Sequence, residues 1–309
     1  MTTEYIQKLK TEIIKLKKRK NAIILAHNYQ LPEVQDVADY IGDSLELTLK
    51  ALETDVDIIV FAGVSFMAET AAILNPDKIV LHPDPRSKCV LAEMLTYDYI
   101  RNIREKYLDA PIVLYINSPT HLKVYSDYVV TSSSASKLIS KLGEDTVIFG
   151  PDKNLAEYAA ELTGKSIIPI PEYGHCPIHE CLISRYYVEE ALTNYPDGKV
   201  IVHPEVPRDS RKLAHYVGST SQMIKAIGNI DCKVCLIGTE EGLVYRARKL
   251  YPDKEIYPIN PRAVCIDMKK INLLNIKRSL ELIKPRVSID REVAKSVREI
   301  IENSLALVR

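Results

Sequence analysis

Short apolar runs of strand length alternate along this chain of 309 residues with longer segments whose apolar residues recur at helical spacing. The first runs are rich in β-branched residues, as in Ile23-Ile24-Leu25, and end in a cluster of polar residues. Buried parallel strands are continuously apolar and are joined by helical crossovers. The alternation therefore predicts an α/β fold built on parallel sheets.

This pattern occurs three times at a constant spacing. The first runs end at His27, Tyr115 and His203, which are separated by steps of 88 and 88 residues. Seventeen residues beyond these anchors stand three hydroxyl side chains, Ser44, Ser132 and Thr220. Thirty-five residues beyond them, a second apolar run ends in Ala62, Gly150 and Gly238. A repeat of this length indicates duplicated domains.

A third apolar run closes each repeat, and a cysteine follows each one. Cys89, Cys176 and Cys265 lie 62, 61 and 62 residues past their anchors. We expect three similar α/β/α domains with parallel sheets, arranged around a pseudo-threefold axis. Their ranges are 1–91, 92–178 and 179–271, and the C-terminal helices of residues 272–309 complete the first domain.

Helical spacing of apolar residues is also found at both ends of the chain. Ile6, Leu9 and Ile13 recur at this spacing within the basic segment 1–20, which predicts a helix and not a leader sequence. The segment 292–309 has the same character, and we expect it to pack with the N-terminal helix on the first domain.

Three domains around one axis would bring equivalent strand ends together, and with them the three cysteines. Ligands of open parallel sheets bind beyond the carboxyl ends of strands. One central site should therefore collect the polar residues at these ends, which are His27, Tyr29, Tyr115, Asn117, His203 and Glu205.

Composition narrows the classes of partner. Lys plus Arg equals Asp plus Glu at 41 each, so there is no basic excess for binding nucleic acid or an anionic membrane. No apolar run reaches the ~20 residues that a membrane span needs. We expect a cytoplasmic protein that acts on small molecules, in which the six cysteines are thiols or metal ligands and not disulfides.

The three periodic cysteines are candidate metal ligands. Each opens a helix-like segment, and a helix N-terminus favours the thiolate that binds metal. Three thiolates on a four-iron cluster would leave one iron open as a Lewis acid for carboxylate, hydroxyl or imine groups. The alternative is that these cysteines fill a core, and their periodicity argues against it.

The other cysteines lack this period. Cys232 and Cys235 have a metal-like spacing, but they enter the second strand of the third repeat and are expected to be buried there. Cys181, with His175 and His179, could form a local zinc site, although no partner pattern accompanies it.

The periodic hydroxyls of Ser44, Ser132 and Thr220 have two interpretations. Each could simply cap a helix. Together with backbone N–H groups at three helix starts, they could instead form an anion pocket for carboxylates or phosphate. The strand-end residues His27, Tyr29, Tyr115, His203 and Glu205 would then be candidates for proton transfer, unless some are ordinary structural polar groups.

Several motifs along almost the whole chain resemble the quinolinate synthase family. They are Ala26-His27-Asn28-Tyr29-Gln30, Gly42-Asp43-Ser44, Tyr115-Ile116-Asn117, Thr131-Ser132-Ser133, Gly150-Pro151-Asp152-Lys153-Asn154-Leu155, His203-Pro204-Glu205, Gly218-Ser219-Thr220, Gly238-Thr239-Glu240 and Cys265-Ile266-Asp267-Met268-Lys269.

The resemblance implies a transferase of NAD biosynthesis that condenses iminoaspartate with dihydroxyacetone phosphate to give quinolinate, with loss of phosphate and water. It implies one [4Fe-4S] cluster per chain, held by Cys89, Cys176 and Cys265 with one open iron that binds substrate. The family's substrate-contacting positions fall on His27, Ser44, Tyr115, Asn117, Ser132, His203, Glu205 and Thr220. Its acid–base positions fall on Tyr29 and Glu205, and we expect Tyr115 and His203 to take part in catalysis beside them. Transient contact with the enzyme that supplies the imine is a further expectation.

Two loops depart from the family pattern. Arg86-Ser87-Lys88 precedes the first cysteine in place of the small residues expected there, and the segment 172–179 lacks an expected tryptophan. Both departures leave the cysteine in register.

Two other functions are compatible with the residues alone. A cluster-dependent dehydratase of another hydroxy acid would use the same three ligands and the same anion pocket. A binding protein without enzymatic activity would hold zinc or nothing, and would be colourless after anaerobic purification. A radical S-adenosylmethionine enzyme is disfavoured, because no close Cys-x-x-x-Cys-x-x-Cys triplet occurs.

Overall fold

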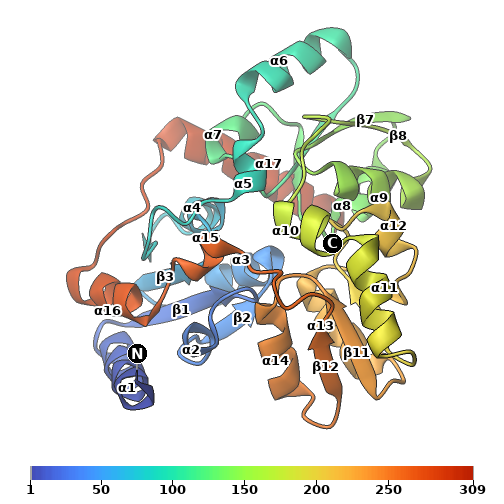
Figure 1. Cartoon of the computed structure of the whole chain (residues 1–309). Coiled ribbons are helices and arrows are strands. Elements are labelled where there is room, and N and C mark those ends of the chain that lie inside the picture. Colours follow the sequence, from blue (N-terminus) through green and yellow to red (C-terminus); the bar gives the residue numbers. More distant parts are fainter. Residues whose placement is uncertain (1, 309) are drawn as a thin grey trace. The chain divides into compact units, whose positions relative to one another are not determined.

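The computed structural model describes residues 2–308, and within them it contains three four-stranded sheets whose strands are all parallel (Figure 1). The first sheet has the order β2-β1-β3-β4, with β1 Ala22–His27, β2 Tyr40–Gly42, β3 Ile58–Ala62 and β4 Ile79–Leu81. The second has the order β6-β5-β7-β8, with β5 Ile112–Tyr115, β6 Tyr128–Val130, β7 Thr146–Gly150 and β8 Ser166–Pro169. The third has the order β10-β9-β11-β12, with β9 Lys199–Val202, β10 Tyr216–Val217, β11 Val234–Gly238 and β12 Glu255–Pro258.

The register of the central strands confirms the repeat. The residue before each anchor pairs with the residue 35 positions beyond that anchor: Ala26 with Ala62, Leu114 with Gly150, and Val202 with Gly238. The three sheets thus have the same strand order and the same alignment, as expected for three similar α/β/α domains.

The helices connect and cover these strands. They are α1 Thr3–Arg19, α2 Pro32–Gln35, α3 Ser44–Glu53, α4 Ser65–Leu74, α5 Val90–Glu93, α6 Tyr97–Lys106, α7 Thr120–Lys123, α8 Ala135–Lys141, α9 Lys153–Thr163, α10 Pro177–Leu182, α11 Arg185–Asn194, α12 Arg208–Arg211, α13 Thr220–Asn229, α14 Gly242–Leu250, α15 Ile266–Lys269, α16 Leu273–Leu282 and α17 Arg291–Val308. In this part of the chain no helix is both long and apolar enough to cross a membrane.

The chain forms two compact units. Unit 1 contains the residues up to Cys89 together with Cys265–Lys295, and unit 2 contains Val90–Val264 together with the residues from Ser296 on. Unit 1 holds the first sheet, and unit 2 holds the second and third sheets. Met1 and Arg309, the ends of the predicted domain ranges, lie outside the described residues.

Both faces of the sheets are buried, which explains why the strands are continuously apolar. In unit 1, α1 and α16 pack side by side over Ile24 and Val60 (Figure 1), while α3 and α4 contact the strands as well. In the third sheet, Ile201 and Ile237 face α13 and α14, whereas Val200 and Leu236 face α11. Alternate residues of one strand therefore enter two different cores.

The position of the last helix corrects the expectation that residues 272–309 as a whole complete the first domain. α16 does pack with α1, but α17 from Ser296 on belongs to unit 2. There the Ser304 hydroxyl accepts a hydrogen bond of 2.9 Å from the backbone N–H of Val129 in β6. Because β6 is an edge strand, its outward amides lack a strand partner, and the helix satisfies one of them.

Cys235 lies where the sequence predicted, buried in the core of the third sheet, with Cys232 packed against the same core. Burial and the adjacent Cys232 raise the pKa of the Cys235 thiol to about 12. A thiol with so high a pKa remains protonated. The buried-strand prediction is thus confirmed for Cys235, whereas Cys232 is half-buried and precedes β11.

Candidate functional site

In unit 1, the polar residues that follow β1 are held by the segment after Cys265. His27 ends the strand, and its Nδ1 accepts the N–H of Tyr29 at 3.2 Å, with the two rings edge to face. Lys269 donates to the Tyr29 carbonyl at 2.8 Å. The Gln30 amide, fully buried, lies 3.7 Å from the sulfur of Met268. The His27 and Tyr29 loop is thus tied to α15, directly after Cys265.

The segments that carry Cys89 and Cys265 are also joined to each other. The buried Ser87 hydroxyl donates to the Asp267 carbonyl at 2.7 Å, and Lys270 donates to the Arg86 carbonyl at 2.9 Å. Cys265 is the N-cap residue of α15, and Cys89 directly precedes α5. Two cysteines 176 residues apart in sequence therefore sit in hydrogen-bonded segments of one unit.

These contacts explain the unusual lead-in to Cys89. The Asp84 carboxylate binds the Arg86 guanidinium through two hydrogen bonds of 3.0 and 2.8 Å, and this pairing lowers the pKa of Asp84. Arg86 itself remains largely exposed. Ser87 is the one residue of the lead-in that is buried, and its hydroxyl bonds the backbone oxygen of Asp267.

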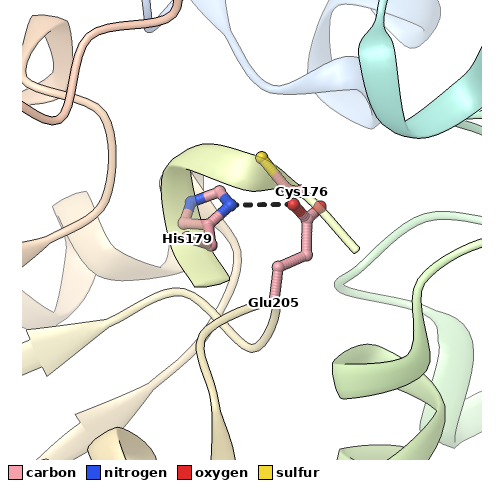
Figure 2. Close-up of side chains that lie close together, drawn as sticks. All are labelled: Cys176, His179 and Glu205. Atoms are coloured by element: carbon pink, nitrogen blue, oxygen red, sulfur yellow. Dashed lines mark hydrogen bonds and ion pairs between the residues drawn. The ribbon is translucent and has the colours of Figure 1, made fainter. Parts of the chain in front are cut away.

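In unit 2, a hydrogen-bonded chain of buried side chains crosses the carboxyl ends of three strands. The Tyr115 hydroxyl, at the end of β5, donates to Glu205 Oε1 at 2.7 Å. Glu205 Oε2 lies 2.8 Å from His179 Nδ1, and Figure 2 marks this hydrogen bond with a dashed line. The other ring nitrogen of His179 lies 2.8 Å from Thr239 Oγ1, just beyond β11. His203 stacks on His179 with ring centroids 4.8 Å apart.

This arrangement keeps Glu205 ionised. Burial by itself would raise the pKa of Glu205, but the imidazoles of His203 and His179 and the hydrogen bonds from His179 and Tyr115 lower it to about 2. Because the carboxylate is an acceptor, Nδ1 of His179 must carry the proton of their hydrogen bond. Glu205 is thus a buried anion at neutral pH.

Cys176 begins α10 next to this series of hydrogen-bonded side chains, and Asp152 fixes the backbone of Cys176. The buried Asp152 carboxylate accepts the N–H of Leu155 at 2.7 Å and that of Cys176 at 3.2 Å, so one side chain both caps α9 and holds the cysteine loop. Burial and the charge of Glu205 raise the pKa of Asp152 well above its ordinary value. Sulfur, imidazole and carboxylate approach one another here, with ligand atoms of Cys176, His179 and Glu205 all within 4.8 Å (Figure 2).

The periodic hydroxyls are not the helix caps. Asp43 caps α3 through the N–H groups of Leu45 and Glu46, and Ser219 caps α13. Ser44 and Thr220 are therefore first residues of their helices, and the capping interpretation is wrong for both. Ser132 likewise lies outside α8, whose N-cap residue is Ser134.

Asn117 presents a buried acceptor. Among the described residues, its Oδ1 has no hydrogen-bond partner. A buried polar atom without a protein partner is costly, so this acceptor is a candidate to receive a hydrogen bond from a ligand or from water.

The predicted residues are thus divided between the units. His27, Tyr29, Ser44, Cys89 and Cys265 belong to unit 1, whereas Tyr115, Asn117, Ser132, Cys176, His203, Glu205 and Thr220 belong to unit 2. Within unit 2 the structure brings together Tyr115, His203 and Glu205 with Cys176 nearby.

The sequence did not assign His179, Thr239 or Asp152 to the site. The sequence places His179 only with His175 and Cys181, but Cys181 is exposed, and both ring nitrogens of His179 are directed to Glu205 and Thr239. The spacing of three between Cys176 and His179, which places them on one side of a helical turn, is the signal that could have identified it.

Comparison with known proteins supports the expectation from the motifs. A family model described as Quinolinate synthetase A protein matches residues 11–306. The chain is 51% identical to the quinolinate synthase of Pyrococcus abyssi, over 96% of this chain and 98% of that protein. It is 50% identical to the quinolinate synthase of Thermococcus kodakarensis (97% and 99%) and 48% identical to that of Thermotoga maritima (94% and 96%).

Proposed function

We propose that this chain, which belongs to the quinolinate synthetase A family, makes quinolinate from iminoaspartate and dihydroxyacetone phosphate, with loss of phosphate and water. Family membership over nearly the whole chain assigns quinolinate synthase activity and a place in NAD biosynthesis. The observation that carries the chemistry is the buried, ionised Glu205 held between Tyr115 and His179.

We assign Cys89, Cys176 and Cys265 as the ligands of one [4Fe-4S] cluster per chain. Their chemistry fits: none of the three forms a disulfide, each is partly exposed, and each directly precedes a helical turn. Cys235, by contrast, is buried with a strongly raised pKa. When bound through three thiolates, a cluster supplies an iron with an open position that acts as a Lewis acid.

Glu205 is the proposed general base. Its carboxylate is ionised and desolvated, and a proton taken up by either oxygen lies within one hydrogen bond of Tyr115 or His179. Tyr29, whose backbone is held by Lys269, is the proposed partner acid from unit 1. His203, stacked on His179 and 3.8 Å from Glu205, tunes the same carboxylate.

Substrate binding is assigned to the polar groups at strand ends and helix starts. Asn117 Oδ1 is an acceptor suited to an imine or hydroxyl hydrogen of the substrate. Ser44 and Thr220, at first helical positions, offer hydroxyl donors that suit phosphate or carboxylate. His27 and Ser132 complete the proposed set. We further propose a cytoplasmic location and transient contact with the enzyme that supplies the imine.

The test is quinolinate formation from dihydroxyacetone phosphate and iminoaspartate generated in the assay, under anaerobic conditions. Wild type should form quinolinate, and Glu205→Gln or Tyr29→Phe should lose it while retaining iron and sulfide. Tyr186→Phe, at an exposed tyrosine, is the matched control for Tyr29→Phe. Full activity in Glu205→Gln with an intact cluster would show that the acid–base assignment is wrong.

A further inference from the structure

We propose that Cys176, His179 and Glu205 form a second metal site, which takes a single divalent ion such as Zn²⁺ when no cluster is bound. The site lies within unit 2 and is made by α10 and the loop after β9 (Figure 2). The binding of the ion does not depend on the proposed function. Only its competition with cluster assembly, through the shared Cys176, rests on that function.

The three ligand atoms are nearly at the spacing that a zinc ion requires. All lie within 4.8 Å of one another, and the imidazole and carboxylate atoms are 2.8 Å apart. Zinc binds sulfur at about 2.3 Å and nitrogen or oxygen at about 2.0 to 2.2 Å, which places tetrahedral ligand atoms about 3 to 4 Å apart. Side-chain rotations that move the ligand atoms by about 1 Å would therefore bring them to the spacing that zinc requires.

Each ligand is held in place by a neighbour that does not itself bind the ion. Thr239 Oγ1 lies 2.8 Å from Nε2 of His179, the Tyr115 hydroxyl bonds Glu205 Oε1, and Asp152 holds the backbone N–H of Cys176. Such outer contacts orient metal ligands and are part of most metal sites. The site is thus preorganised without an ion.

The proton balance is also favourable. When the ion binds, Cys176 releases its thiol proton to the solvent, and the proton on Nδ1 of His179 is exchanged for one on Nε2. There the Thr239 hydroxyl, which can donate or accept, becomes the acceptor. One thiolate and one carboxylate then neutralise the two positive charges of the ion, so no net charge is buried.

The ligand set determines the class of ion. Sulfur and imidazole nitrogen with one carboxylate suit Zn²⁺ or Co²⁺, whereas Mg²⁺ and Ca²⁺ prefer sites made of oxygen. An ion held here would occupy both Cys176 and Glu205. Zinc is therefore expected to block cluster assembly and to remove the proposed base at the same time.

Cobalt is the probe, because thiolate coordination to tetrahedral Co²⁺ gives visible and near-ultraviolet absorption bands. Titration of the reduced, cluster-free full chain should show one Co²⁺ bound with a thiolate band that Zn²⁺ abolishes. Cys89→Ala and Cys265→Ala, the matched cysteine controls, should bind as wild type does. Cys176→Ala and His179→Gln should lose the band.

A second variant allows the proposal to be tested even if His179→Gln does not fold. Thr239→Val keeps all three ligands but removes the contact to Nε2, and should weaken Co²⁺ binding by about 10- to 100-fold. The proposal is overturned if His179→Gln keeps the wild-type spectrum, or if Cys89→Ala or Cys265→Ala loses it, because the ion would then be using the three cysteines.

Separate iron and sulfide analysis distinguishes this inference from the proposed function. Wild type preloaded with Zn²⁺ should fail to assemble a cluster, whereas His179→Gln should assemble one in the presence of Zn²⁺. Cluster assembly that Zn²⁺ leaves unaffected in wild type would contradict the competition. Absence of a cluster under every condition would contradict the proposed function and leave the cobalt result standing.

Discussion

The imidazole of His179 and the carboxylate of Glu205 meet in a hydrogen bond of 2.8 Å, both side chains being almost wholly buried. One residue comes from the short helix that Cys176 begins, and the other from the end of β9. Their contact links the cysteine loop to the proposed base.

Replacement of Glu205 by glutamine should reduce quinolinate formation by about 100-fold or more, because loss of a general base commonly has an effect of this size. Glutamine keeps the size of the side chain, so iron and sulfide contents should be unchanged. Glu189→Gln, at an exposed position of α11, is the matched control and should be fully active. Steady-state assays beside metal analysis provide the measurement.

The pKa of Glu205 leads to a prediction for stability against pH. A carboxyl whose pKa is depressed to about 2 binds fewer protons in the folded chain than in the unfolded chain. Its contribution, about 3 kcal/mol, is present above its ordinary pKa near 4.5 and is lost as the pH falls toward 2. The difference in unfolding free energy between wild type and Glu205→Gln should therefore shrink over this range.

Urea unfolding of the cluster-free chain at several pH values measures this difference. As the pH falls, the contribution of Asp152 to the stability of the folded chain changes in the opposite sense, since burial and the charge of Glu205 raise its pKa. The comparison should therefore be repeated with Asp152→Asn in both proteins. A difference that stays constant from pH 6 to pH 3 in that background would contradict the assigned charge of Glu205.

Gly174→Ala should disturb the loop before Cys176. A Cβ at Gly174 would lie 1.9 Å from the Pro151 carbonyl oxygen, so the backbone must move. Overpacking of this kind costs about 1 to 3 kcal/mol, and we expect a lower melting temperature with reduced iron content. Gly143→Ala is the control, because its Cβ meets nothing within 4 Å. Equal melting temperatures for the two variants would refute the prediction.

Ser87→Ala should loosen the connection between the segments of Cys89 and Cys265. It leaves the Asp267 carbonyl without its 2.7 Å donor, at a cost of about 1 to 2 kcal/mol. Iron should be released faster to a chelator than from wild type. Ser140→Ala, an exposed change of the same type, should release iron at the wild-type rate.

The architecture could be predicted from the sequence because the repeat is visible in the continuously apolar, buried strands. Ala26, Leu114 and Val202 pair as the alignment predicts, since continuous apolar runs and their spacing define the central strands. The edge strands β2, β6 and β10 were missed. They contain two or three residues each, too few for a recognisable pattern.

The site was predicted less completely, for two physical reasons. The strand-end residues Tyr115 and Glu205 could be found because the fold fixes where strands end. His179 and Asp152 act through contacts made by loops, which apolar periodicity does not describe. The same holds for α17: its apolar spacing predicted a helix, but only the free edge of β6 explains where it packs.

Anaerobic iron and sulfide analysis of the three cysteine variants tests the central claim most directly. Wild type should contain about four iron and four sulfide ions per chain, and Cys89→Ala, Cys176→Ala and Cys265→Ala should each lose them, while Cys181→Ala, at an exposed cysteine, should not. A full cluster in any of the first three variants, or a wild-type chain that assembles none, would contradict the account.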